Sequence, residues 1–254
     1  MKILITNDDG IMAPGIRELA IEIAKAHDVT VVAPKEQRSA NSHAITLFEP
    51  ITIEEQSIDG FNGKAFSVAG TPADCVRLAM EGKLVENPDF VLSGINLGYN
   101  AGMDILYSGT VSAAIEANVY KIPSMAISSR YVDGEARYDT AAKVALEILE
   151  FVQEPMKGWP LLLNVNVPYL DYEELGEMTI CPVGNVIYDR YERSFADGAG
   201  PLTLSLTGRY DQVPIKGSDR DYLSQGNVTI TPLIYDLTNY SLMNVVRSWF
   251  NNNK

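Results

Sequence analysis

The chain has 254 residues, of which 46% are hydrophobic, and its acids outnumber its bases 33 to 20 for a formal net charge of -13. This length is enough for one large α/β domain or for two small ones, each with an apolar core. The negative charge excludes sequence-independent binding to long nucleic acids, because such binding needs clustered Lys and Arg to displace counterions.

Short apolar runs and helix-like segments alternate through residues 1–168. Runs rich in β-branched residues predict strands at 2–6, 29–33, 45–53, 65–68, 90–92, 124–127 and 161–167. Apolar residues at helical spacing predict helices at 16–26, 72–80, 110–117 and 141–151. Because strand–helix–strand units form right-handed parallel crossovers, this order predicts a doubly wound α/β body with a mostly parallel sheet.

The character of the sequence changes after Pro168. Strand-like pieces at 178–182, 202–206 and 228–231 are separated by Gly, Asp and Tyr, and a last helix is predicted at 241–250. We therefore predict a body at 1–168 and an antiparallel extension at 169–254. The extension is poorly equipped to fold alone, so we expect it to pack on the body or on a partner subunit.

Two adjacent carboxylates follow the first predicted strand, in the segment TNDDG at residues 6–10. Ligands of open parallel sheets bind at the carboxyl ends of the strands. Asp8 and Asp9 repel each other there unless a proton or a cation lies between them, and a divalent metal satisfies both. The alternative is an Asx turn that leads into the next helix. The segment has neither the Lys-Ser/Thr of a P-loop nor the GxGxxG of a dinucleotide site.

The loop after the second predicted strand contains the polar segment QRSANSH at residues 37–43. Its hydroxyl and amide groups are candidate metal ligands or phosphate donors, and a polar surface loop is the alternative. His27 and His43 are the two histidines of the chain, so a His-rich zinc site is excluded. Catalysis would then depend on carboxylates, hydroxyls, amides, backbone groups or a hard metal ion.

A third segment, SGINLGYNAGMDILYSGTV at residues 93–111, also follows a predicted strand and ends where a helix begins. Its glycines allow the backbone to approach an anion closely. The N–H groups of Ser108, Gly109 and Thr110 start the helix, and a helix N-terminus is suited to bind phosphate. Ser108 is also a candidate nucleophile, but no histidine is close in sequence to activate it, so we favour the phosphate-binding role.

All three segments follow predicted parallel strands, and we expect the fold to bring them to one edge of the sheet. The groups that would meet there are two carboxylates, a hydroxyl and an amide oxygen. Such an all-oxygen set suits Mg²⁺, Mn²⁺ or Ca²⁺ better than zinc. A hard cation beside a phosphate-binding helix start favours the transfer of a phosphoryl group to water.

These segments resemble the SurE family of stationary-phase survival nucleotidases, and the resemblance extends from Met1 to about Thr238. It is carried by residues 5–10, by Ala33-Pro34 with Ser39-Ala40, by GTPADCV at 70–76, by the long segment at 93–111 and by Thr231-Pro232-Leu233. It implies a Rossmann-like, three-layer body. It also implies a 5'-nucleotidase, a phosphomonoester hydrolase that cleaves nucleoside 5'- and 3'-monophosphates, and in some members short polyphosphate, with metal-activated water.

The resemblance also implies site residues and an assembly. One divalent cation per subunit (Mg²⁺, Mn²⁺ or Ca²⁺) would be held by Asp8, Asp9, Ser39 and Asn96. We further predict that the two aspartates are catalytic and that phosphate is bound by Asn7, Asn100, Ser108, Gly109 and Thr110. The family forms homodimers or homotetramers in which the C-terminal segment and a β-hairpin are exchanged between subunits, so we expect the extension at 169–254 to be exchanged.

The chain departs from the family in one respect. Some relatives have a histidine in the late C-terminal segment that assists catalysis, whereas this chain has none after His43. Asp219 and Asp221 lie in the corresponding region. We interpret them as part of a solvated acidic loop or a helix start rather than as catalytic groups.

Two other classes of protein remain as alternatives. One is a non-catalytic nucleotide sensor that uses the same pocket, and the other is a zinc-dependent sugar deacetylase, which would need two histidine ligands. The cysteines and the apolar runs bear on localisation. Cys75 and Cys181 have no CxxC partner, and no apolar run approaches the ~20 residues of a membrane span. We therefore expect a cytoplasmic protein that binds neither a membrane nor a nucleic-acid polymer. Its expected partners are nucleoside monophosphates and other copies of itself.

Overall fold

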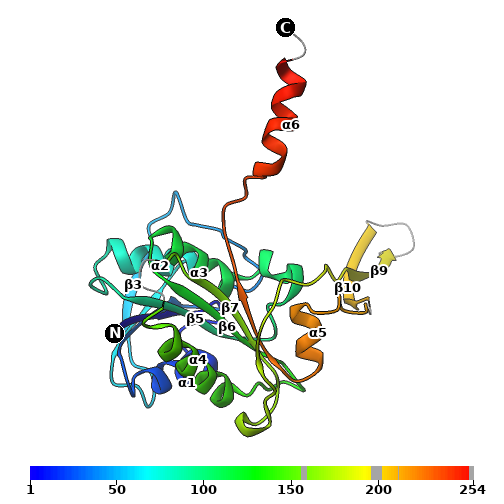
Figure 1. The fold of residues 1–254 in the computed structure, drawn as a ribbon. Coiled ribbons are helices and arrows are strands. Elements are labelled where there is room, and N and C mark those ends of the chain that lie inside the picture. Colours follow the sequence, from blue (N-terminus) through cyan, green and yellow to red (C-terminus); the bar gives the residue numbers. More distant parts are fainter. Residues whose placement is uncertain (156–158, 196–201, 211, 252–254) are drawn as a thin grey trace.

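A nine-stranded sheet forms the centre of the protein in the computed structural model, which describes residues 1–155, 159–195, 202–210 and 212–251 (Figure 1). The strand order is β3-β4-β2-β1-β5-β6-β7-β11-β8. These strands are β1 (Lys2–Thr6), β2 (Asp28–Pro34), β3 (Ile53–Gln56), β4 (Lys64–Val68), β5 (Phe90–Leu97), β6 (Ser124–Ser129), β7 (Leu162–Val167), β8 (Met178–Ile180) and β11 (Val228–Pro232).

The central part of the sheet is parallel. Strands β4, β2, β1, β5, β6 and β7 pair in parallel, while β3 runs antiparallel to β4 and β11 antiparallel to β7. The outermost strand, β8, is parallel to β11. The predicted α/β class with a mostly parallel sheet is thus confirmed.

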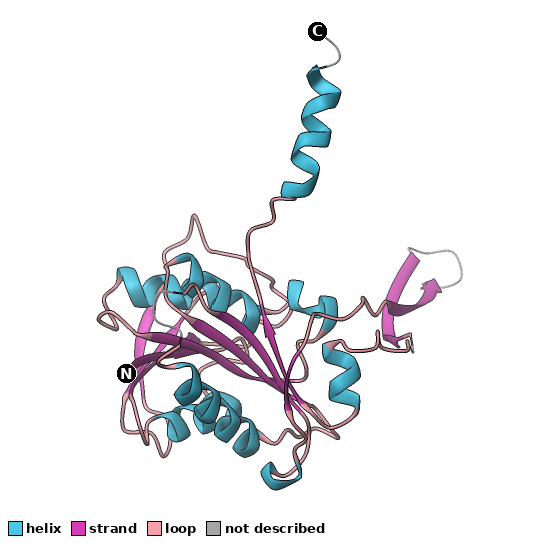
Figure 2. Cartoon of the chain, in the orientation of Figure 1, coloured by secondary structure: helices cyan, strands magenta, loops and turns pink. Residues whose placement is uncertain are grey.

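Helices cover the sheet on both faces, as Figure 2 shows. α1 (Pro14–Ile23) and α4 (Tyr138–Val152) contact each other on one face, and α2 (Pro72–Glu81) and α3 (Gly109–Val119) do so on the other. Side chains of β1 alternate between these layers. Ile3 and Ile5 belong to the core under α1 and α4, whereas Leu4 belongs to the core under α2 and α3. The three layers follow from this period of two along a strand.

Residues 45–53 were predicted as a strand, and this prediction is wrong except at its last residue. Thr46 donates hydrogen bonds to the Asp74 carboxylate from its N–H group (3.1 Å) and from its hydroxyl (2.7 Å), and the Thr71 hydroxyl donates to the Ala44 carbonyl (2.7 Å). These bonds hold the segment against the start of α2 instead of the sheet. Pro50 also cannot donate to a ladder, so pairing with β4 begins only at Ile53.

Two further elements differ from the sequence-based expectation. The strand predicted at 90–92 continues as β5 to Leu97, into a segment expected to be loop. A hairpin of β9 (Asp189–Phe195) and β10 (Leu202–Arg209) lies beside the body, and only its second strand was predicted. β9 has the sequence DRYERSF, which lacks the alternation of apolar and polar residues that marks a half-buried strand.

Part of the C-terminal extension joins the central sheet, and part of it lies outside the body. β8 and β11 complete the sheet, and α5 (Asp219–Ser224) packs on β11. α6 (Tyr240–Asn251) stands away from the body in Figure 1, and none of its residues is buried. Among the described residues, no helix has both the length and the apolar content needed to cross a membrane.

Candidate functional site

A cavity of about 270 Å³, called here the Asp8 cavity, opens at the carboxyl edge of the sheet. The predicted site residues that line it are Asp8, Asp9, Ser39, Asn96, Asn100 and Ser108. They come from the three polar segments at 6–10, 37–43 and 93–111, which follow or end β1, β2 and β5. Because neighbouring parallel strands end at one edge, segments far apart in sequence meet there.

Asp8 is the most deeply buried carboxylate of the cavity, at 4% exposed. Its Oδ1 accepts a short hydrogen bond from the Thr110 hydroxyl. Burial raises the pKa of Asp8 from 3.8 to about 6; the hydrogen bond from Thr110 lowers it, and the charge of Asp9 adds to the increase. A buried carboxylate without a cation is therefore destabilised in its ionised form.

Asp9 is connected to the second segment through Gln37. The Gln37 side-chain amide donates to Asp9 Oδ1 (3.2 Å) and to Ser39 Oγ (2.9 Å), while the Leu97 N–H donates to Asp9 Oδ2 (3.1 Å). Burial raises the pKa of Asp9, although the hydrogen bonds from Leu97 and Gln37 lower it. Gln37 thus holds the Asp9 carboxylate and the Ser39 hydroxyl in fixed relative positions.

The oxygen atoms in the cavity fit a hard divalent cation. The Asn96 amide nitrogen donates to the Gly98 carbonyl (2.8 Å), and its Oδ1 accepts no hydrogen bond from the described residues. Ser39 contributes a hydroxyl. In the described ranges, no Lys, Arg or His forms an ion pair with Asp8 or Asp9, and no group of three or more His, Cys, Asp and Glu could hold a metal. A mixed set of carboxylate, hydroxyl and amide oxygens suits Mg²⁺, Mn²⁺ or Ca²⁺.

The start of α3 packs directly on Asp8. Ser108 is the N-cap of this helix, and its Oγ accepts from the Val111 N–H (3.1 Å). A Cβ atom added at Gly109 would lie 2.8 Å from Asp8 Cβ and 3.1 Å from Pro72 Cγ, so only glycine allows this approach. The positive end of the helix therefore lies beside the carboxylate pair, and the Thr110 N–H donates a hydrogen bond to Asp8. An anion that bridges to a cation would fit at this position.

Thr110 influences the ionisation of Asp8. Thr110→Val removes the hydroxyl that stabilises the ionised carboxylate, so the pKa of Asp8 is expected to rise. If ionised Asp8 is the active form, the acid limb of a kcat/KM profile against pH moves to higher pH. Thr140→Val is a matched control. Thr140 lies in α4 on the other face of the sheet, is equally buried, and donates a hydrogen bond to the Leu170 carbonyl. A profile of Thr110→Val that coincides with that of the control contradicts this role.

Asn100 is held by a network of polar side chains. Its N–H donates to Asn166 Oδ1 (2.9 Å), its side-chain amide donates to Ser128 Oγ (2.8 Å), and its carbonyl accepts from Asn164 (2.8 Å). These partners lie on β6 and β7 and were not predicted as site residues. Because the network fixes the backbone and the amide nitrogen, Asn100 presents its side chain to the cavity in a defined orientation.

Of the predicted phosphate-binding residues, Asn100 and Ser108 line the Asp8 cavity, whereas Asn7, Gly109 and Thr110 do not. Asn7 is completely buried, its amide donates to the Gly10 carbonyl (2.9 Å), and its Oδ1 accepts from the Gly10 N–H (3.2 Å). Its two bonds close the turn that places Asp8 and Asp9, and Gly10 has a φ of 101°, which favours glycine.

Both histidines are engaged outside the cavity. His43 Nε2 lies 2.7 Å from Glu116 Oε2, and His27 Nδ1 lies 3.3 Å from the N-terminal nitrogen of Met1. Neither lines the Asp8 cavity. Among the described residues, no histidine forms a hydrogen bond with Ser108. This favours a role of Ser108 as a helix cap and phosphate donor over that of a nucleophile.

Several residues of the cavity were not singled out from the sequence. They are Gln37, Tyr99, Asp104, Tyr107 and Arg209. The first four lie inside the polar segments, so their positions in the sequence could have identified them. Arg209 lies on β10, where the sequence contains no motif that indicates a site. Burial raises the pKa of Tyr99 to about 12, and its hydroxyl has no hydrogen-bond partner within the described part of the chain.

Asp219 is also more than a helix start. α5 begins at this residue, as one of the two interpretations predicted, but the other, a solvated acidic loop, is wrong. Asp219 is completely buried and accepts hydrogen bonds from the N–H groups of Gly102 (2.7 Å) and Gly184 (2.9 Å). It connects the extension to η1 (Gly102–Leu106), a 3₁₀ turn in the third segment.

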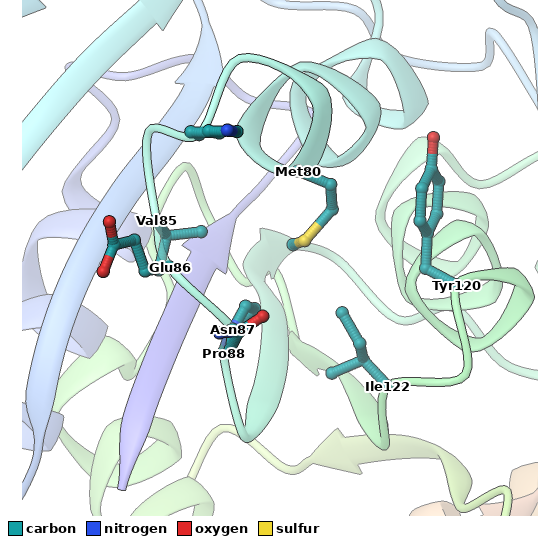
Figure 3. A pocket seen from close by; sticks show the side chains of 8 residues that line it. Met80, Val85, Glu86, Asn87, Pro88, Tyr120 and Ile122 are labelled. Carbon is teal, nitrogen blue, oxygen red and sulfur yellow. The ribbon is translucent and has the colours of Figure 1, made fainter.

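A larger cavity of about 650 Å³ lies at the opposite edge of the sheet (Figure 3). Met80 and Glu86 line one side of it, and Tyr120 and Ile122 line the other. α2 and α3 both end beside this cavity, and the negative end of a helix disfavours an anion. The features that suit a phosphate therefore lie at the Asp8 cavity.

Comparisons with known proteins identify the family of this chain. A family model described as Survival protein SurE matches residues 3–190. A protein named 5'-nucleotidase SurE from Clostridium botulinum (strain Kyoto / Type A2) is 45% identical over 251 residues, which cover 98% of this chain and 99% of that protein. Another of the same name, from Clostridium tetani (strain Massachusetts / E88), is 43% identical over 251 residues, which cover 98% of this chain and 100% of that protein. The crystal structure of the SurE protein from Aquifex aeolicus has a TM-score of 0.84 and 34% identity, with 98% of this chain and 99% of that chain covered. The chain belongs to the SurE family.

Proposed function

We propose that the protein is a 5'-nucleotidase that hydrolyses nucleoside 5'-monophosphates to nucleoside and phosphate at the Asp8 cavity. The observation that carries this proposal is the contact between the start of α3 and Asp8, which places anion-binding N–H groups beside a pair of carboxylates. The names of the relatives, 5'-nucleotidase SurE, point to the same reaction. The proposal includes activity on 3'-monophosphates and on short polyphosphate as secondary substrates.

We further propose that one divalent cation, Mg²⁺ or Mn²⁺ with Ca²⁺ as a weaker alternative, is held by Asp8, Asp9, Ser39 and Asn96. Such an ion would polarise the phosphoryl group and lower the pKa of a water molecule. The donor set supports this, since two neighbouring carboxylates with raised pKa values gain most from a positive charge between them. Gln37 would keep Asp9 and Ser39 in position when the ion enters or leaves.

The roles of the surrounding residues follow from their positions. The amides of Gly109 and Thr110 and the side chains of Ser108 and Asn100 would hold phosphoryl oxygens as negative charge spreads over them. Asp9, which is less buried than Asp8, would take the proton from the attacking water. Asn7 would act on the loop rather than on the phosphate.

The test is phosphate release from a panel of nucleoside 5'- and 3'-monophosphates and polyphosphate, with each cation and with chelator. We expect cation-dependent release that is fastest with a 5'-monophosphate. Nucleotide binding without phosphate release would identify a sensor instead. Release of acetate from an acetylated sugar would identify a deacetylase, which the positions of His27 and His43 disfavour because neither lines the cavity.

We propose that residues 1–168 form the catalytic body and that the extension at 169–254 mediates assembly into a homodimer or homotetramer. α6 supports this, because it is amphipathic and yet has no buried residue. Apolar side chains on β10, among them Leu204 and Leu206, are also at least half exposed. Cys75 and Cys181 are both buried free thiols, which suits the reducing cytoplasm in which we expect the enzyme to work.

A double substitution on α6 tests the assembly. Leu242→Glu with Val246→Glu places two charges on one face of the helix, where both side chains are apolar and partly exposed. We expect light scattering to show an oligomer for the native chain and a smaller species for this variant. Asn244→Glu with Ser248→Glu adds the same charges at the same spacing on the opposite face and should leave the mass unchanged. A monomeric native chain, or equal masses for the two variants, contradicts the proposal.

A further inference from the structure

Arg209 lines the Asp8 cavity, although it lies on β10 and almost one hundred residues beyond the last of the three polar segments. Within the described part of the chain, it is the one basic side chain among the residues that line this cavity. A substrate phosphate that enters the cavity meets three carboxylates, those of Asp8, Asp9 and Asp104. A guanidinium at this point therefore attracts an anionic substrate that the three carboxylates repel.

Two carboxylates hold the Arg209 guanidinium in place. Its Nη1 lies 2.5 Å from Asp104 Oδ2, and its Nε lies 3.2 Å from Asp189 Oδ1, the residue paired with it across the hairpin. Its third nitrogen, Nη2, has no acceptor within hydrogen-bond distance in the described ranges. The side chain is thus oriented by two of its nitrogen atoms, while the third remains able to donate.

Arg220 completes the group. Its Nη2 lies 2.7 Å from Asp104 Oδ2 and 2.6 Å from the Ala101 carbonyl, and its side chain is 15% exposed, against 47% for Arg209. Two guanidinium groups therefore balance the carboxylates of Asp104 and Asp189. The wall of the cavity that carries Asp104 is neutral because of this pairing, and Arg209 is the more accessible of its two cations.

We propose that Arg209 is a substrate-binding residue, which donates from Nη2 to an oxygen of the substrate phosphate and cancels the charge of Asp104 in the cavity wall. This inference rests on the proposed function. Guanidinium groups bind phosphate oxygens through charge-assisted hydrogen bonds, and a pre-oriented guanidinium loses less conformational freedom on binding. The exposed β9–β10 hairpin would in this way contribute directly to the site.

The experiment measures steady-state kinetics on a nucleoside 5'-monophosphate, together with inhibition by inorganic phosphate, in the full chain. Arg209→Ala is compared with Arg193→Ala, which removes the same charge from an exposed position on β9 of the same hairpin. Asp189→Asn removes one of the two contacts that orient Arg209 but keeps the guanidinium. Arg209→Lys keeps the charge with a different shape. Since Arg209 is partly exposed, its replacement leaves the core of the sheet unchanged.

The expected result is an increase of about 10- to 100-fold in KM and in the inhibition constant of phosphate for Arg209→Ala, as for the loss of one charge-assisted hydrogen bond. Arg209→Lys and Asp189→Asn, which leaves the guanidinium oriented by Asp104 alone, should lie between this variant and the native chain, and Arg193→Ala should stay within about threefold of the native chain. Equal constants for Arg209→Ala and Arg193→Ala overturn the inference. So does an increase in KM for Arg209→Ala that leaves the inhibition constant of phosphate unchanged, which would indicate that Arg209 only anchors the hairpin. Absence of hydrolysis by the native chain would overturn the proposed function itself.

Discussion

Asp8→Asn is expected to reduce phosphate release by about 1,000-fold or more, equivalent to about 4 kcal/mol of transition-state stabilisation. Asparagine has the shape of aspartate and can still accept the hydrogen bond from Thr110, so the fold is preserved. It lacks the negative charge that a cation between Asp8 and Asp9 requires. Measurement of phosphate release and of cation binding by calorimetry should show both functions lost together.

The same variant is expected to be more stable than the native chain when no cation is present. The pKa of Asp8 is raised in the folded state to about 6 from 3.8, so the unfolded chain binds fewer protons in this window. The free energy of unfolding of the native chain therefore falls as pH rises from about 4 to about 6. The ionisation of buried Asp8 accounts for about 3 kcal/mol of this decrease, and the loss persists above pH 6. Asp8→Asn removes this loss.

Thermal unfolding in chelator at pH 4 and pH 7.5 measures the effect. We expect Asp8→Asn to unfold about 5–10 °C higher than the native chain at pH 7.5, with a much smaller difference at pH 4. Asp59→Asn is the control, since the Asp59 side chain is 95% exposed. A variant that is less stable than the native chain at pH 7.5 and that retains full turnover would contradict both the burial argument and the role of Asp8.

Gly109→Ala is expected to reduce kcat by about 100-fold, although alanine is the better helix former. The added Cβ would lie 2.8 Å from Asp8 Cβ and 3.1 Å from Pro72 Cγ, so the start of α3 has to move away from Asp8. This movement displaces the N–H groups of the helix start and the Thr110 hydroxyl from the carboxylates. Overpacking of this kind also costs about 1–3 kcal/mol of stability, which thermal unfolding would detect.

Gly63→Ala is the control for Gly109→Ala. It is expected to lower stability without displacing the start of α3, so it distinguishes the effect of that displacement from a general loss of stability. A Cβ atom at Gly63 would also be crowded, at 2.7 Å from the Val29 carbonyl oxygen, but this site precedes β4 at the edge of the sheet opposite to the Asp8 cavity. We expect Gly63→Ala to unfold at a lower temperature while its kcat stays near that of the native chain. Equal kcat values for the two variants would show that the approach of α3 to Asp8 has no effect on turnover.

The body of the fold could be predicted because its strands are buried on both faces. β1, β2, β6 and β7 are almost completely buried, so each is visible as an apolar run between helical patterns. The polar segments after these strands then identify one edge of the sheet. That topology predicts that the three segments meet at one edge, and the structure places Asp8, Asp9, Ser39, Asn96 and Ser108 around one cavity there.

The parts that could not be predicted depend on contacts between distant residues. Residues 45–52 have the composition of a strand, but Thr46 bonds to Asp74, 28 residues further along the chain. Asn100 is oriented by partners on β6 and β7, up to 66 residues away. Arg209 reaches the cavity because of the hairpin register and the ion pair with Asp104, and its own sequence neighbourhood contains no sign of a site.

The most direct test of a cation-dependent phosphomonoesterase at the Asp8 cavity is the release of inorganic phosphate from a nucleoside 5'-monophosphate. The native chain and Asp8→Asn are compared after removal of all metal and again after addition of Mg²⁺ or Mn²⁺. We predict release by the native chain only after the cation is added, and almost none by Asp8→Asn under either condition. Full release in chelator, or equal release by the two proteins with the cation, would contradict it.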